Sequence, residues 1–179
     1  MDTTLKPISV AVHRVRSVLT RRPEAALHVD TPATARWQGG FRVAMSDGLG
    51  GQFCTDMPAE LGGTGDQVTP GWLFRAGMAA CATTSIVLMA AADGIELAAL
   101  EVRVDSHSDV RGLLGMNDAA GAPVHAGPSD LKMHVSVDAP GVAPERLRAL
   151  IEGAVVCSPV PSMVRQANSL QLQLDIVGT

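Results

Sequence analysis

Residues 69–94 read TPGWLFRAGMAACATTSIVLMAAADG, and this stretch decides the fold. Thr69 followed by Pro70 is a typical helix start, because threonine caps the first free amides and proline suits the first helical position. Asp93-Gly94 is a typical helix end. Arg75 is the one charged side chain before the last turn. Since nearly every face of this helix is apolar, we expect other elements to pack around it.

The flanking segments predict two further helices and several antiparallel strands. Apolar residues recur at helical spacing over about residues 5–22 and 144–156. Short or alternating apolar runs predict strands at 27–37, 41–45, 51–54, 98–106, 131–137 and 170–177. Ser46-Asp47-Gly48 predicts a hairpin turn, and residues 56–69 a long loop. Strands and helices do not alternate regularly, so the order predicts an α+β fold rather than a parallel sheet.

Length and composition narrow the class of protein. The 179 residues suit a single domain, which we divide into an N-terminal helical extension at 1–25 and a core at 26–179. A net charge of -4 and a lack of tyrosine disfavour nucleic-acid binding. Residues 76–92 carry no charge but are only just long enough to span a bilayer, so we expect a buried core helix and no membrane contact.

The chain has three cysteines, Cys54, Cys81 and Cys157. Their wide spacing is a poor disulfide framework, and no signal peptide is evident, so we expect free thiols in the cytoplasm. Neither the cysteines nor the five histidines show metal-ligand spacing, and we expect no metal and no cofactor. Taken alone, Cys81 and Cys157 are either small buried apolar residues or reactive thiols.

Two motifs resemble one known family. The run from Thr69 to Cys81, with a proline that opens the helix and a cysteine eleven residues later, resembles the central-helix signature of the OsmC/Ohr family, the osmotically inducible protein C and organic hydroperoxide resistance proteins. Val156-Cys157-Ser158-Pro159-Val160 resembles the second cysteine motif of that family. The resemblance extends over about residues 30–177.

The resemblance implies a fold and a function. The fold would be antiparallel sheets wrapped around a long buried central helix, in an intertwined homodimer with sites at the subunit interface. The function would be that of a thiol-dependent peroxidase acting on organic hydroperoxides. Cys81 would attack the peroxide, Cys157 would resolve the resulting sulfenic acid as a disulfide, and an external dithiol would reduce the disulfide. Cys54 would be a spare thiol.

The chain departs from the family pattern at two positions. Family peroxidases place a glutamate just after the helix-opening proline, where this chain has Gly71 and Trp72. They also have an arginine at a position that falls near Gly39 of this chain, which is not an arginine. Arg36 and Arg42 flank that second position and could stabilise a thiolate, although a strand surface also suits them, and Trp72 could line a pocket. The departures leave an alternative open: an OsmC-like protein without peroxidase activity that binds an apolar small molecule at the dimer interface.

Overall fold

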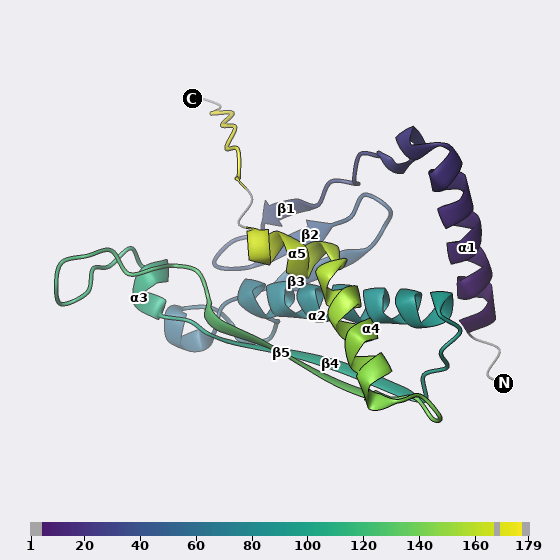
Figure 1. The fold of residues 1–179 in the computed structure, drawn as a ribbon. Coiled ribbons are helices and arrows are strands. Elements are labelled where there is room, and N and C mark those ends of the chain that lie inside the picture. Colours follow the sequence, from purple (N-terminus) through teal and green to yellow (C-terminus); the bar gives the residue numbers. More distant parts are fainter. Residues whose placement is uncertain (1–4, 167–168, 177–179) are drawn as a thin grey trace.

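The computed structural model describes residues 5–166 and 169–176, and its long central helix is α2, Pro70–Ala92 (Figure 1). The helix begins and ends where the sequence predicts. The Thr69 side chain accepts a hydrogen bond from the Trp72 amide, and Asp93 caps the other end. The mixture of helices and antiparallel strands confirms the α+β class.

Five other elements surround α2. These are α1 (Leu5–Arg21), the antiparallel pair β4 (Ala99–His107) and β5 (Ser129–Asp138), α4 (Pro144–Val156) and α5 (Pro159–Gln166). In Figure 1 the β4–β5 ribbon runs along one side of α2, α4 crosses the helix, and α1 stands at its C-terminal end. All five lie close to their predicted positions except α5, which the sequence analysis did not predict.

The core of the molecule is a stripe along α2. The buried residues Met78, Ala82, Ile86 and Ala90 recur every four positions, which places them on one face of the helix. Ile86 and Ala90 form a buried cluster with residues of α4 and of the loops that flank the β4–β5 ribbon. Other faces of α2 are only partly covered by this chain, and Leu88 remains 42% exposed. By length and composition α2 could also span a membrane, and 22% of its most apolar window is buried within this chain.

A second sheet lies to one side of this core. It has the order β1-β2-β3, with β1 at Thr34–Trp37, β2 at Val43–Ser46 and β3 at Gln52–Thr55. The predicted hairpin turn joins β2 to β3, where the Asp47 carboxylate accepts hydrogen bonds from two amides of the turn. All of β1 is exposed, and the aromatic side chains of Trp37 and Phe53 face solvent.

Two predicted strands differ from the structure. Residues 27–33 are not in a strand, because β1 begins at Thr34, which pairs with Ser46 at the very end of β2. Residues 170–176 are also not a strand, and the last predicted residue, Val177, lies outside the described residues. Alternation indicates which side chains share a face, but a strand exists only where a second strand satisfies its backbone groups. Four short elements were not predicted: the turns Pro23–Ala26 and Ala59–Leu61 and the helices α3 (Val110–Leu113) and α5.

Candidate functional site

Cys81 lies eleven residues into α2, on a part of the helix that contacts α5. Its side chain is half-buried, and its sulfur accepts two hydrogen bonds. The Ser158 hydroxyl donates one at an Oγ–Sγ distance of 3.2 Å, and the Val160 amide donates the other at an N–Sγ distance of 3.5 Å. Both donors come from the junction between α4 and α5, so residues far apart in the sequence build the surroundings of the thiol.

The geometry of that junction decides which side chain meets Cys81. Helix α4 ends at Val156 with Cys157 as its C-cap, and α5 begins at Pro159 after a bend of 68°. Ser158 lies between the two helices and is fully buried. Cys157, its neighbour, is exposed, and its amide donates to the carbonyl of Gly153 in α4. The structure therefore brings Ser158, rather than Cys157, into contact with the Cys81 sulfur.

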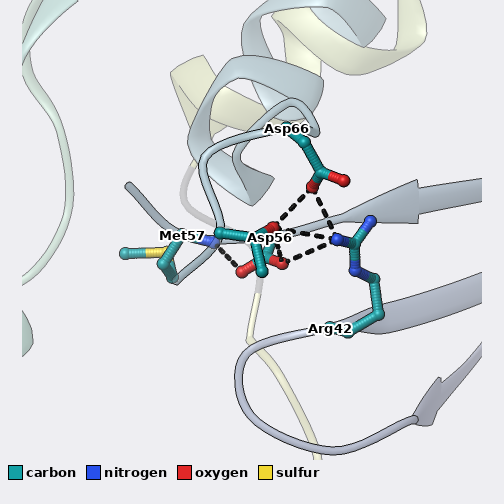
Figure 2. A network of polar contacts seen from close by, with 5 residues as sticks. Arg42, Asp56, Met57 and Asp66 are labelled. Atoms are coloured by element: carbon teal, nitrogen blue, oxygen red, sulfur yellow. Dashed lines mark hydrogen bonds and ion pairs between the residues drawn. The ribbon is translucent and has the colours of Figure 1, made fainter. Parts of the chain in front are cut away.

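A charged network lies at the end of β3, where the loop to α2 begins (Figure 2). Arg42 Nη2 lies 3.2 Å from Asp56 Oδ2 and 2.5 Å from Asp66 Oδ1. The Thr64 hydroxyl lies 2.8 Å from the same Asp56 oxygen, and the Met57 amide donates to the other one. The Asp56 side chain is only 1% exposed. This network joins the three-stranded sheet to the loop that leads into α2.

Hydrogen bonds keep the carboxylates of this network ionised. The hydrogen bond from Thr64 is the main cause that lowers the pKa of Asp56, and the Met57 amide and Arg42 also lower it, against the opposing effect of burial. The Thr64 hydroxyl, whose single proton the two carboxylates share, and Arg42 also lower the pKa of Asp66. Two anions therefore share the charge of Arg42, which the sequence analysis considered for Cys81.

The other predicted site residues, Arg36 and Trp72, and the spare thiol Cys54 form no hydrogen bond to this sulfur among the described residues. Arg36 is exposed on β1, where it pairs in register with Ala44. Trp72 is half-exposed on the first turn of α2. Cys54 lies half-buried on β3. Within residues 5–166 and 169–176, the hydrogen bonds to the Cys81 sulfur come from Ser158 and Val160 alone.

An apolar cavity of about 520 Å³ lies at the N-terminal end of α2. Its walls are the loop from Met57 to Leu61, the first turns of α2, and the segments around α3 and Pro128. The loop wall requires glycine at position 63, because a Cβ atom there would lie 1.9 Å from the Met57 carbonyl oxygen. The cavity also has polar groups, including Arg75, which donates to the Ser106 hydroxyl at 3.3 Å.

Sequence reasoning missed Ser158 and Asp56. A signal existed for Ser158, because a serine directly before a proline is a common start for a new helix. No comparable signal existed for Asp56, because an acidic residue in a loop rich in glycine and proline is most often solvated.

Comparisons with known proteins agree on one family. The family model described as OsmC-like protein matches residues 63–173. An OsmC-like protein from Mycoplasma pneumoniae is 17% identical, with a TM-score of 0.64 over 78% of this chain and 89% of its own. An organic hydroperoxide resistance protein from Legionella pneumophila is 25% identical, with a TM-score of 0.52 over 78% and 91%. One from Elizabethkingia anophelis, crystallised with thiocyanate, is 24% identical, with a TM-score of 0.55 over 78% and 90%. No curated protein matches the chain.

Proposed function

The chain belongs to the OsmC-like protein family, and on that premise we propose that it is a thiol-dependent peroxidase that reduces organic hydroperoxides at Cys81. One observation carries this proposal. The Cys81 sulfur is half-buried in a folded core and accepts two hydrogen bonds, from Ser158 and Val160. Hydrogen bonds donated to sulfur favour the thiolate, which is the nucleophilic form.

The first step is an attack of the Cys81 thiolate on the distal oxygen of the hydroperoxide. The S–O bond forms as the O–O bond breaks, so sulfur is oxidised to sulfenic acid and the peroxide is reduced. The alkoxide leaves and takes a proton from solvent to become an alcohol. A hollow of about 200 Å³ is lined by Met78, one turn before Cys81 in α2, by other largely apolar side chains, and by Lys132 and Arg165, and it suits an organic peroxide.

The second step is resolution by Cys157, the second thiol of the proposed pair. Its sulfur attacks the sulfenic sulfur, a disulfide forms and water leaves, and an external dithiol then reduces the disulfide by exchange. In the structure both thiols are free and Ser158 contacts the Cys81 sulfur, so formation of this disulfide would bring the Cys157 sulfur to the place that the Ser158 hydroxyl occupies.

The assembly that we propose is a cytoplasmic homodimer. Residues 170, 172, 174 and 176 are apolar and between 68% and 93% exposed, and the three-stranded sheet also exposes aromatic side chains. A second copy of the chain would cover these surfaces, because clustered exposed apolar side chains mark sites of association. The three widely spaced cysteines are a poor disulfide framework, which supports a reducing compartment.

Intact-mass measurement after one equivalent of cumene hydroperoxide tests the peroxidase proposal. We expect the wild-type chain to lose about 2 Da as a disulfide forms, and Cys157→Ser to gain about 16 Da as sulfenic acid persists. Cys81→Ser should consume no peroxide, and Cys54→Ser, the matched control, should behave as wild type. Both thiols remaining free in the oxidised wild-type sample would refute the proposal.

The cavity at the start of α2 favours a second candidate function, the binding of an apolar small molecule. Its volume of about 520 Å³ lies within the range of ligand sites, and most of its walls are apolar. Under this function, wild type and Cys81→Ser consume peroxide equally slowly, and a medium-chain alcohol raises the thermal midpoint. Leu61→Trp, which fills the cavity, should abolish that rise, whereas Leu49→Trp on an exposed turn should not.

A further inference from the structure

The hydrogen-bond donors to the Cys81 sulfur are neutral groups, and Arg42 is engaged elsewhere. The hydrogen bonds to the sulfur come from the Ser158 hydroxyl and the Val160 amide. Arg42, which could have stabilised a thiolate, forms ion pairs with Asp56 and Asp66. Any stabilisation of a charged sulfur by these contacts therefore comes from hydrogen-bond donors.

Ser158 is built into the fold as a donor. Its side chain is fully buried, so its hydroxyl has no water to bind, and a buried hydroxyl needs a partner within the protein. Its backbone is held on both sides, because its amide donates to the Val155 carbonyl in α4 and its carbonyl accepts from the Ser162 amide in α5. The position of the hydroxyl against the sulfur is thus set by two helices.

Hydrogen-bond donors interact differently with a thiol and with a thiolate. A neutral thiol is a weak acceptor, whereas a hydrogen bond to an ionised acceptor is about twice as strong as one between neutral groups. Two donors that converge on one sulfur therefore stabilise the thiolate more than the thiol. An amide and a hydroxyl play the same part toward oxyanions in enzymes that bear no cation at that point.

We propose that Ser158 is a catalytic residue whose hydroxyl, together with the Val160 amide, forms a two-donor site for the negative charge on Cys81. The site does the work that a fixed arginine would otherwise do. It rests on the proposed function only for what the sulfur attacks next. The reactivity of the Cys81 sulfur toward an alkylating reagent is measurable without any peroxide.

Alkylation of Cys81 by iodoacetamide at pH 7, followed residue by residue with mass spectrometry, tests the donor site. We expect Ser158→Ala to slow alkylation of Cys81 by roughly tenfold, the loss of one hydrogen bond to a charged group. If Ser158 had a purely structural role, its replacement would instead raise the rate of alkylation, because a loosened junction would expose the sulfur. Cys54 and Cys157 in the same sample serve as internal references, and Ser162→Ala, one turn along α5, is the matched control.

An unchanged or faster rate for Cys81 in a folded Ser158→Ala protein would overturn the proposal. If that variant fails to fold, Ser158→Cys combined with Cys157→Ser supplies a second test. An Oγ–Sγ distance of 3.2 Å places the introduced thiol against Cys81, so mild oxidation should join the two as a disulfide within the chain. Absence of that disulfide would also overturn the proposal. Because alkylation uses no peroxide, a failed peroxidase assay would leave these results unaffected.

Discussion

The two sheets of this protein differ in what packs against them. The β4–β5 ribbon packs against α2, and the buried cluster around Ile86 lies between that helix, α4 and the loops beside the ribbon. The β1–β3 sheet leaves all of β1 exposed, and the segment 169–176 has no strand to pair with in the described chain. The chain therefore packs the half that contains α2 and the β4–β5 ribbon with its own residues. It leaves the half that contains the β1–β3 sheet, here called the open half, without such cover.

The charged network links the two halves. Arg42 directly precedes β2 and Asp56 directly follows β3, so both belong to the open sheet, while Asp66 lies in the loop that leads to α2. In Figure 2 the guanidinium of Arg42 points toward both carboxylates. Since little apolar contact holds the open sheet, we expect these polar contacts to matter for its position.

The largest expected effect comes from removing the apolar side chains of the C-terminal segment, which tests whether a second copy covers the open half. If a second copy covers them, the wild-type particle in multi-angle light scattering has twice the chain mass of 18.6 kDa. Leu172→Asp combined with Leu174→Asp should halve that mass, because buried charges oppose association. Gln171→Asp combined with Gln173→Asp, on the alternate positions, should change it little. A wild-type particle of one chain would show that the open half stays uncovered.

Two residues of similar size in α2 differ in burial, and replacing each one tests how much that burial contributes to stability. Ile86 is fully buried, so Ile86→Ala should lower the free energy of unfolding by about 2–5 kcal/mol through lost contacts and a cavity. Leu88 is 42% exposed, and Leu88→Ala should cost less than about 1 kcal/mol in a lone chain. Urea denaturation gives both values. A cost at Leu88 close to that at Ile86 would show that a partner covers that face as well.

The smallest expected effect concerns the link between the halves. Asp56→Asn should lower the thermal midpoint at pH 7, because the amide cannot form the ion pair with Arg42 or accept as strongly from Thr64. The folded state lowers the pKa of Asp56 below its ordinary value of 3.8, so this carboxylate adds stability above that pH and loses it as pH falls further.

The difference in thermal midpoint between wild type and Asp56→Asn should therefore be largest at pH 7 and should shrink below about pH 4. Thermal scans between pH 3 and pH 7 measure it. Asp105→Asn, an exposed carboxylate paired with Arg103, is the control and should show little change at any pH. A gap that widens as pH falls would contradict the assignment of this carboxylate as a stabilising anion.

Much of the fold was predictable from local patterns. Thr69-Pro70 and Asp93-Gly94 marked both ends of α2, and alternation placed β4 and β5 within one or two residues of their observed bounds. The prediction for residues 170–176 was wrong as a strand, although the alternation itself is real. This segment has no partner strand within the described chain, and it could form a strand only by pairing with one.

The site shows a similar division. The sequence was enough to single out Cys81 on an apolar helix and to suggest a second motif near Cys157, because caps, periodicity and spacing are properties of neighbouring residues. Only the tertiary structure decided that Ser158 meets the sulfur and that Arg42 is held by Asp56 and Asp66. The physical reason is that a bend of 68° between α4 and α5 selects one of two adjacent side chains, and long-range packing alone sets that bend.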